Sequence, residues 1–216
     1  MSKIIKPPWN LKGFGFITLY KFDNSFLVEK NLIPKFLKNK KTKGLGAIML
    51  VNYDNTPIGS YHELLFIPSK FSFPNRNLAT ISKIYVSTEE SVNCGIKNWG
   101  MPKEIANFNF TKVDKKRTKV EVTKDSIEIA SFTFKETIIP IPVSTNIIKF
   151  PLIQKKNDNL YITNFEGFGK GKMAIIEEQN INDKFFPNVS NQTPLITIKV
   201  EKFNIKFPKP EVLKDV

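Results

Sequence analysis

Most of the chain alternates between apolar and polar positions, which is the period-two pattern of strands that bury one face. Helical spacing occurs only in short pieces. The alternation predicts ten strands, over residues 12–20, 45–53, 60–66, 81–87, 105–113, 119–123, 127–134, 159–165, 172–180 and 195–207. So many strands in 216 residues, with no linker long enough to divide them, favour a closed barrel or a strongly curved sheet, since closure removes exposed edges. We therefore expect a mainly β (α+β) fold in a single domain, residues 1–216.

A first short helix is predicted over residues 26–37, whose apolar side chains recur at helical spacing. Asn24 or Ser25 can cap its start, because their side-chain oxygens accept hydrogen bonds from the free amides of the first turn. Pro34 should bend this helix or end it early, since proline has no N–H to donate. We expect the helix to pack on the barrel as a lid rather than to bind a ligand.

A second helix is predicted to begin at Ser87. The Ser87 hydroxyl and Glu90, three residues later, have the spacing of a capping box. Three apolar residues then recur on one face of this helix: Val92, Ile96 and Trp99. The helix should end near Gly100, because a proline follows two residues later.

Two further segments predict turns. Residues 124–126 separate two alternating strands by a short polar stretch and suit a β-hairpin. The glycine-rich segment Gly167–Lys172 lacks the Ser or Thr that follows the lysine of a phosphate-binding loop, and no strand-to-helix junction frames it. We interpret it as a tight turn at the rim of the barrel.

The composition supports a folded protein with one sizeable core, because 41% of the residues are hydrophobic and 12% are aromatic. No apolar stretch approaches the roughly 18–20 residues that span a bilayer, and the first nine residues lack the apolar core of a secretion signal. Cys94 is the only cysteine, so the chain has no internal disulfide. These features lead us to expect a cytoplasmic protein.

The formal net charge of +13 raises nucleic acid or an anionic membrane as a partner. The basic residues are nearly all lysines, with Arg76 and Arg117 as the only arginines, whereas proteins that read bases and phosphates favour the bidentate fork of arginine. The basic runs at residues 38–43 and 112–119 fall where turns are expected and suit solvated loops. We expect no nucleic-acid partner and no membrane partner. Lysine-driven binding to polyanions is kept as an alternative, which predicts a steep salt dependence.

The sequence offers little material for a metal centre. His62 is the only histidine and Cys94 the only thiol, so a zinc or iron site would need carboxylates alone, and the usual catalytic triads are missing. We expect no metal and no cofactor. We expect Cys94 to be a small buried residue, and His62 to point away from the interior if its neighbour Glu63 points into it.

One segment combines a lysine with apolar neighbours in a way that suits amine chemistry. Lys103 follows Pro102 and opens a predicted strand. The apolar residues on either side of it are Trp99, Met101, Ile105 and Phe108. If the lysine points into an apolar interior, loss of hydration disfavours its ammonium form and lowers its pKa, as an amine nucleophile requires. From the spacing alone, an exposed lysine at the start of a strand is the alternative.

Three stretches resemble the acetoacetate decarboxylase family in their order and spacing. They are Gly59–Pro68 (GSYHELLFIP), Ile84–Ser87 (IYVS) and Asn98–Lys103 (NWGMPK). Weaker similarity covers most of the chain. The resemblance implies that residues 1–216 form one acetoacetate decarboxylase-like domain, a β-barrel or double-barrel cone with an internal apolar cavity and a few short helices. It also implies a homo-oligomer, because family members generally assemble.

The resemblance implies a reaction as well. In that family, the lysine of the Pro-Lys turn attacks a substrate ketone and forms a Schiff base, which accepts the electron pair released on decarboxylation. By position, Lys103 matches this nucleophile and Glu63 matches a cavity carboxylate that handles protons or orients the substrate. For Glu63, an acid at the barrel rim paired with some lysine is the alternative. The residues expected to contact the substrate are Trp9, Ile48, Tyr61, Trp99 and Met101.

Three positions depart from the family pattern. Family decarboxylases follow the nucleophile with a second lysine, where this chain has Glu104, which would lie outside the cavity if the segment is a strand. A second cavity carboxylate is expected 15 residues before Glu63 and falls on Ile48. Where the family has an early arginine at the cavity mouth, this chain offers Trp9 and Lys12. A pocket with these residues should suit a larger or more apolar ligand than acetoacetate.

Two hypotheses from different classes follow. The first is a lyase that uses Lys103 as a Schiff-base nucleophile, with Glu63 assisting, on a keto acid or related small-molecule carbonyl substrate. The reaction would be decarboxylation, or aldol condensation and dehydration through the same imine. The second is a non-catalytic barrel that binds an apolar small molecule. The reactivity of Lys103 discriminates between them.

Overall fold

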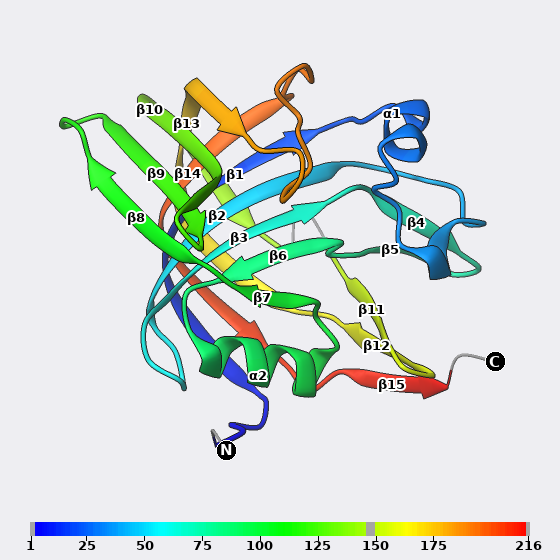
Figure 1. Cartoon of the computed structure of the whole chain (residues 1–216). Coiled ribbons are helices and arrows are strands. Elements are labelled where there is room, and N and C mark those ends of the chain that lie inside the picture. The colour runs from blue at the N-terminus through cyan, green and yellow to red at the C-terminus, as the bar shows by residue number, and fades with distance from the viewer. Residues whose placement is uncertain (1–2, 146–149, 215–216) are drawn as a thin grey trace.

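The computed structural model describes residues 3–145 and 150–214, which are mainly strands in two sheets (Figure 1). The larger sheet has ten strands among these residues. In spatial order they are β7 (Lys103–Ile105), β6 (Lys83–Val86), β3 (Tyr61–Ile67), β2 (Gly46–Asn55), β1 (Trp9–Tyr20), β14 (Ile196–Phe207), β13 (Glu166–Ile181), β10 (Ile127–Ser144), β9 (Arg117–Lys124) and β8 (Asn107–Lys112). The prediction of a mainly β fold with a few short helices is confirmed.

The ten-stranded sheet curls until its two edge strands come close to each other. β7 and β8 lie at opposite ends of the strand order, yet only Ala106 separates them in the chain. The N–H of Ala106 donates to the carbonyl of Val86 at 2.9 Å, which ties the start of β8 to the end of β6. Figure 1 shows the nearly closed barrel that results, with β8 and β9 in front of β14 and β1.

Alternation along the strands builds a separate apolar core on each face of this sheet. On β2, Val51 and Tyr53 belong to one buried cluster, whereas Leu50 belongs to the other. The second cluster fills the interior of the curled sheet with aromatic rings, and Phe16 stacks on Phe134 with ring centroids 4.0 Å apart. The first cluster lies on the opposite face and surrounds the cavity described below.

A smaller sheet of five strands covers that opposite face. In spatial order its strands are β15 (Glu211–Lys214), β12 (Asn159–Thr163), β11 (Leu152–Lys156), β5 (Arg76–Ala79) and β4 (Lys70–Phe73). Leu152 of β11 pairs with Ala79 of β5, and both side chains are buried in the first cluster. The sequence predicted only β12 of this sheet, because the other four strands show too little alternation to be recognised.

The first predicted helix is shorter than expected. α1 spans Asn24–Glu29, and a separate 3-10 turn, η1, spans Lys35–Leu37 after Pro34. The single helix predicted over residues 26–37 was therefore wrong in extent: α1 ends at Glu29, before Asn31 with its φ of 52°, and Pro34, expected to bend or end the helix, is extended with ψ of 144°. α1 begins after Asp23, and no side chain caps it.

The second helix, α2, spans Glu89–Trp99, whereas it was predicted to begin at Ser87. Thr88 is its cap, and the Thr88 side chain accepts a hydrogen bond from the backbone N–H of Ser91. The hydroxyl of Ser87 instead accepts from the backbone N–H of His62 at 2.8 Å, which ties the start of the helix to β3. No helix within residues 3–145 and 150–214 has the length and apolar character needed to cross a membrane.

The segment Gly167–Lys172 was predicted to be a turn and instead lies within β13. Its glycines face side chains of the neighbouring strand β14. A Cβ atom on Gly167 would lie 2.9 Å from Cγ1 of Ile205, and one on Gly169 would lie 2.7 Å from Cγ1 of Val200. The glycines therefore make room for close strand packing, which also explains their spacing of two residues.

The hairpin predicted at residues 124–126 is confirmed. Lys124 pairs with Ile127, and the two residues between them, Asp125 and Ser126, have φ values of 50° and 64°. Positive φ at both central positions is the conformation of the two-residue turns that match the twist of antiparallel strands. This turn joins β9 to β10.

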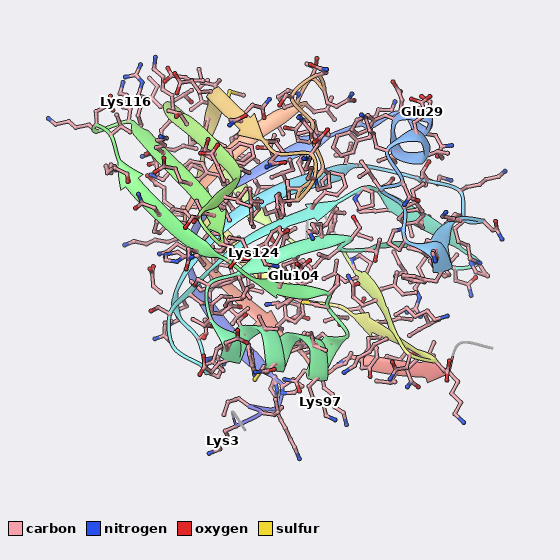
Figure 2. All side chains as sticks on the ribbon, viewed as in Figure 1. Lys3, Glu29, Lys97, Glu104, Lys116 and Lys124 are labelled. Atoms are coloured by element: carbon pink, nitrogen blue, oxygen red, sulfur yellow. The ribbon has the colours of Figure 1, made fainter. Side chains whose placement is uncertain are left out.

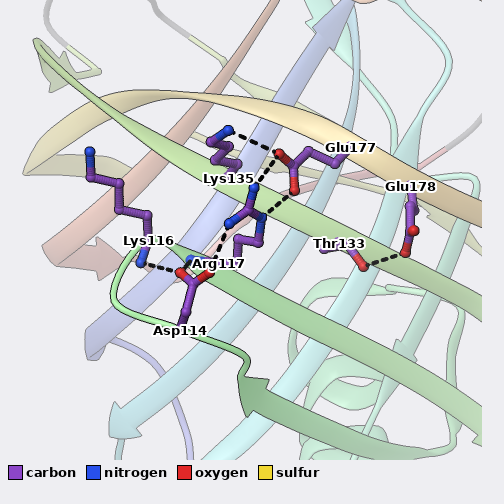
Figure 3. A network of polar contacts seen from close by, with 7 residues as sticks. All are labelled: Asp114, Lys116, Arg117, Thr133, Lys135, Glu177 and Glu178. Carbon is purple, nitrogen blue, oxygen red and sulfur yellow. Dashed lines mark hydrogen bonds and ion pairs between the residues drawn. The ribbon is translucent and has the colours of Figure 1, made fainter.

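Charged side chains form ion pairs on the outer surface. Lys97 and Lys116 project away from the ribbon (Figure 2). In the network of Figure 3, Nε of Arg117 donates to Glu177 at 2.6 Å, and Nη1 of Arg117 donates to Asp114 at 2.8 Å. Hydrogen bonds from Arg117 and from the backbone N–H of Lys116 lower the pKa of Asp114 to about 2. Because these groups are exposed, solvent and salt screen their attraction.

Candidate active site

The end of α2 places Lys103 at the start of β7. Gly100 ends the helix with a φ of 66°, and its N–H donates to the carbonyl of Ile96 at 3.2 Å. Pro102 cannot continue a helix, and the chain then enters β7, where Lys103 pairs with Ile84 of the parallel strand β6. The turn thus carries the lysine from the helix into the sheet, as the sequence predicted.

Lys103 and Glu63 form a buried ion pair. Nζ of Lys103 lies 2.9 Å from Oε2 of Glu63 and 3.0 Å from Oγ of Ser91. The side chains of Lys103 and Glu63 are only 5% and 6% exposed. Nζ also lies 5.2 Å from the centroid of the Tyr61 ring, a distance at which a cation is attracted to the ring face. The fold therefore brings together two residues that are 40 positions apart in the chain.

Two tyrosines surround the carboxylate of Glu63. The hydroxyl of Tyr53 donates to Oε1 of Glu63 at 3.2 Å. Burial raises the pKa of Tyr53 well above 10.0, and the negative charge of Glu63 raises it further. Burial and then Glu63 likewise raise the pKa of Tyr61, while a hydrogen bond with Ser91 acts in the opposite direction. Both hydroxyls therefore keep their protons at neutral pH, and Tyr53 serves as a donor.

Helix α2 approaches Lys103 through its smallest residue. A Cβ atom on Gly95 would lie 2.5 Å from Cδ and 2.7 Å from Cε of Lys103, so the lysine stem occupies the space that any larger residue would fill. Ser91, one turn earlier, presents its hydroxyl to Nζ. The fully buried residues of this helix are Ser91, Cys94, Gly95 and Trp99. The face predicted to be buried was partly wrong, because Val92 and Ile96 are only half-buried.

The ion pair opens onto a cavity of about 390 Å³ on the face of the large sheet that the small sheet covers. This volume lies within the range of pockets that enclose drug-sized molecules. Among the described residues that line it, the charged ones are Glu63, Lys70 and Lys103. The aromatic ones are Trp9, Phe16, Tyr53, Tyr61, Trp99, Phe150, Phe165, Phe168, Phe203 and Phe207. The cavity is therefore mainly apolar, and its charged groups among the described residues are the Lys103–Glu63 pair and Lys70.

Four of the five predicted substrate contacts line this cavity: Trp9, Tyr61, Trp99 and Met101. Two of them build one wall, where Trp9 meets Trp99 edge to face with centroids 5.0 Å apart. Trp99 is held in place because its Nε1 donates to the carbonyl of Pro208 at 2.8 Å.

Ile48, the fifth predicted substrate contact, is not among the described residues that line this cavity. Ile48 is buried in the cluster that fills the interior of the curled sheet. Neighbouring residues on a strand point to opposite faces, so Met49 and Val51 line the cavity and Ile48 points away from it. Counting 15 residues back from Glu63 crossed the loop between β2 and β3 and reached the wrong face of β2.

Glu104 lies outside the cavity, as expected for the residue after Lys103 on a strand. Its carboxylate pairs with Lys83 at 2.5 Å and with Lys124 at 3.1 Å, and Figure 2 shows Glu104 beside Lys124. Within residues 3–145 and 150–214, no three His, Cys, Asp or Glu side chains are grouped so that they could hold a metal ion.

Sequence reasoning missed three residues of the site, namely Tyr53, Ser91 and Gly95. Tyr53 shares the cavity face of β2 with Val51, so the alternation already contained its signal. Ser91 and Gly95 are four residues apart on the predicted helix and hence lie on one face. The sequence does not show that this face contacts Lys103, so it did not mark either residue as part of the site.

Residues 2–161 match the model of the acetoacetate decarboxylase family. The chain belongs to the acetoacetate decarboxylase family. Its fold is similar to that of acetoacetate decarboxylase from Legionella pneumophila subsp. pneumophila str. Philadelphia 1, with a TM-score of 0.73, 12% identity, and coverage of 99% of this chain and 90% of that one. It is also similar to the enduracididine biosynthesis enzyme MppR complexed with pyruvate, with a TM-score of 0.69, 14% identity, and coverage of 99% and 93%. These structural similarities support the acetoacetate decarboxylase-like fold predicted from the sequence.

A curated relative is similar in sequence to part of this chain. The Protein NEOXANTHIN-DEFICIENT 1 of Arabidopsis thaliana is 29% identical over 120 residues, which make up 54% of this chain and 42% of that protein. The match therefore spans less than half the length of that relative. Within the acetoacetate decarboxylase family, the sequence motif around Lys103 and the buried pair with Glu63 together define the candidate active site.

Proposed function

We propose that this protein is a lyase that forms an imine between Lys103 and a carbonyl substrate, with Glu63 as the group that accepts and returns protons. One observation carries the proposal: Nζ of Lys103 lies at the wall of an apolar cavity, 2.9 Å from the carboxylate of Glu63. A salt-bridged ammonium group must give up a proton before it can attack, and Glu63 is close enough to take it.

The steps balance with these two residues alone. Lys103 passes a proton to Oε2 of Glu63, and the electron pair on Nζ forms a bond to the carbonyl carbon while the C=O π pair moves to oxygen. Glu63 then returns the proton to that oxygen. Glu63 then takes a further proton from the nitrogen and passes it to the hydroxyl group, which departs as water and leaves a protonated C=N bond. The protonated imine accepts an electron pair from a neighbouring C–C or C–H bond, as decarboxylation and aldol reactions both require.

Tyr53 supports this assignment as a positioning residue. Its hydroxyl donates to Oε1 of Glu63, and the other oxygen, Oε2, is the one that contacts Lys103. The carboxylate is therefore held by a neutral donor on one side and by the amine on the other. This arrangement fixes the oxygen that exchanges protons with Nζ.

A second candidate function, non-catalytic binding of an apolar small molecule, is favoured by a different observation. The amino group of Lys103 already has two acceptors, Glu63 and Ser91, and the rest of the described cavity wall is mainly apolar. If the amino group of Lys103 stays protonated in this ion pair, it cannot attack a carbonyl group, and Lys103 would serve only as part of the wall of a binding pocket.

Borohydride trapping tests the proposal. The protein is incubated with a panel of ketones, aldehydes and keto acids and reduced with sodium borohydride, and modified lysines are located by mass spectrometry. We expect a reduced adduct on Lys103. Absence of an adduct with every compound on folded protein, together with binding of an apolar ligand, would support the second candidate instead.

A second lysine of the chain provides the matched control. Lys199 is also buried and ion-paired, with Glu136, but it does not line the cavity. Trapping that depends on the cavity should modify Lys103 and spare Lys199. Lys103→Met should abolish the adduct, whereas Lys199→Met should leave its yield unchanged. Equal labelling of both lysines would indicate non-specific reduction of amines.

A homo-oligomeric state and a cytoplasmic location remain predictions.

A further inference from the structure

Among the described residues, the charges around Lys103 disfavour a substrate carboxylate. The described side chains that face Nζ are the carboxylate of Glu63, the hydroxyl of Ser91 and the ring of Tyr61. The positive charge of Lys103 is already balanced by Glu63. A carboxylate one or two bonds from the reacting carbonyl would therefore meet the negative charge of Glu63 in a site that water barely reaches, and like charges repel strongly there.

The other cation of the described cavity wall is Lys70, which follows the opposite end of β3 from Tyr61. Lys70 lies on β4, beyond the end of β3, and its Nζ lies 4.6 Å from the centroid of the Phe150 ring. Along β3, Glu63 and Ile67 are four positions apart, or about 13 Å of strand, and Lys70 comes three residues after Ile67. Lys70 therefore follows the Ile67 end of β3, whereas Glu63, the partner of Lys103, lies nearer the Tyr61 end.

The cavity is also long. On β3, every second residue from Tyr61 to Ile67 lines it, which corresponds to roughly 20 Å of strand. Apolar side chains of β14, which is separated from β3 by β2 and β1 in the same sheet, also line it from Ile196 to Phe207. A molecule of three or four carbons would leave most of this apolar wall in contact with water, whereas a long hydrocarbon chain would cover it.

We propose that the molecule bound at Lys103 is a neutral, elongated ketone or aldehyde, with its carbonyl group at Lys103 and its hydrocarbon chain along β3 and β14. This inference rests on the proposed function for the position of the carbonyl group. It narrows the reaction to those that need no substrate carboxylate, in which the protonated imine accepts the electron pair of a neighbouring C–H or C–C bond and Glu63 accepts a proton. The hydrocarbon chain supplies the affinity through burial of apolar surface.

Equilibrium binding by calorimetry tests the ligand class directly. The two long ligands are undecan-2-one and freshly prepared 3-oxododecanoate, which has the same hydrocarbon chain and an added carboxylate beside the ketone. The two short ligands are acetone and acetoacetate. We expect undecan-2-one to bind at least about tenfold more tightly than each of the other three. Equal or tighter binding of 3-oxododecanoate, or of acetone, would overturn the inference.

A variant tests the cause of the discrimination. Glu63→Gln keeps the size of the side chain and removes its charge, so the affinity for 3-oxododecanoate should rise and the preference for undecan-2-one should fall by about fivefold or more. Glu136→Gln changes the other buried Lys-Glu pair, which is outside the cavity lining, and should leave the preference unchanged. An unchanged preference in folded Glu63→Gln would contradict the charge argument. The comparison of ligands on the unmodified protein does not depend on either variant.

Trapping separates this inference from the proposed function. If undecan-2-one binds selectively but borohydride leaves no adduct on Lys103, the ligand class stands and imine chemistry fails. If Lys103 is trapped as readily with acetone or acetoacetate as with undecan-2-one, imine chemistry stands and the ligand class fails. Faster trapping with undecan-2-one than with all three other compounds supports both.

Discussion

Gly95 and Lys103 are in direct contact, and the lysine stem lies where a side chain on residue 95 would lie. Cδ and Cε of Lys103 come within 2.5 Å and 2.7 Å of an ideal Cβ position on Gly95. Helix α2 and the turn that carries Lys103 therefore pack closely against each other at Gly95. Because Ser91 precedes Gly95 by one helical turn and contacts Nζ, the same face of α2 holds both the stem and the amino group.

Gly95→Ala should impair the reactivity of Lys103 without unfolding the protein. The added methyl group forces the lysine stem to move, and a small displacement of a reacting group is costly to rate. We expect the borohydride trapping rate to fall by about tenfold or more. Helix α2 itself should tolerate the change, because alanine favours a helix interior over glycine by about 1 kcal/mol.

The control for this prediction is Lys97→Ala, on the exposed face of the same helix. It should leave the trapping rate unchanged. If Gly95→Ala is trapped at the rate of the unmodified protein, the contact between Gly95 and Lys103 does not position the amine.

Lys103→Met should destabilise the fold because it leaves Glu63 buried without its partner. Removing one member of a buried ion pair typically costs about 3–5 kcal/mol, whereas replacing both members by apolar residues is often neutral. The double variant Lys103→Met/Glu63→Leu should therefore recover most of the lost stability. Denaturant unfolding measures both changes.

A partly exposed pair provides the comparison. Lys83 pairs with Glu104, whose side chain is 40% exposed and which also contacts Lys124. Lys83→Met should cost far less than Lys103→Met, since pairs near the surface contribute about 0–1 kcal/mol. Equal losses for the two variants would show that burial of the Lys103–Glu63 pair has no energetic effect.

Alkaline pH should destabilise the protein through its buried tyrosines. Burial raises the pKa of Tyr53 and Tyr61 well above 10.0, and it raises the pKa of Tyr20 to about 12. Above pH 10 the unfolded chain loses protons that the folded chain retains, so the free energy of unfolding falls as pH rises, by about 1.4 kcal/mol per pH unit for each such tyrosine. Below pH 10 these groups add no pH dependence.

Stability measured across this range checks the prediction. Tyr53→Phe should flatten the decline above pH 10, and the tyrosinate absorbance of folded protein near pH 10 should be unchanged by the substitution, because Tyr53 is not ionised there. A loss of tyrosinate absorbance in the variant would mean that Tyr53 titrates normally.

His62 should titrate below its usual pKa. It packs against Phe108 and Phe110, with ring centroids 5.8 Å and 4.9 Å away. Burial lowers the pKa of His62 from 6.5, and the charge of Asp54 partly offsets this. As pH falls below 6.5, the unfolded chain binds a proton that the folded chain does not, so stability decreases.

Because the chain has one histidine, a proton NMR titration reports His62 alone. We expect a midpoint below 6.5, a still lower midpoint in Asp54→Asn, and a midpoint nearer to 6.5 in Phe110→Ala. A rise of the midpoint in Asp54→Asn would be inconsistent with the role assigned to Asp54.

Local patterns predicted the elements whose signals are confined to neighbouring residues. The long strands β1, β2 and β14 alternate over many positions, and Asp125-Ser126 is a turn that the flanking strands define. Short strands such as β4 and β15 escaped prediction, because four residues do not establish a period. The glycines of β13 were wrongly interpreted as a turn. They are needed because side chains of β14, which is distant in the sequence, pack where a side chain on each glycine would lie.

In the candidate site, too, the sequence predicted some features and only the fold decided the others. The motif before Lys103 and its resemblance to the family predicted Lys103 and Glu63 as site residues. Residues that differ from the charged ones of the family predicted a larger or more apolar ligand than acetoacetate. The ion pair, the Tyr53 hydrogen bond and the fit of Lys103 against Gly95 join residues 40, 10 and 8 positions apart and exist only once the strands are paired and the helix is docked. Ile48 shows the reason: which face of a strand meets the cavity depends on register and on the sheet that packs against it, and these are properties of the folded chain.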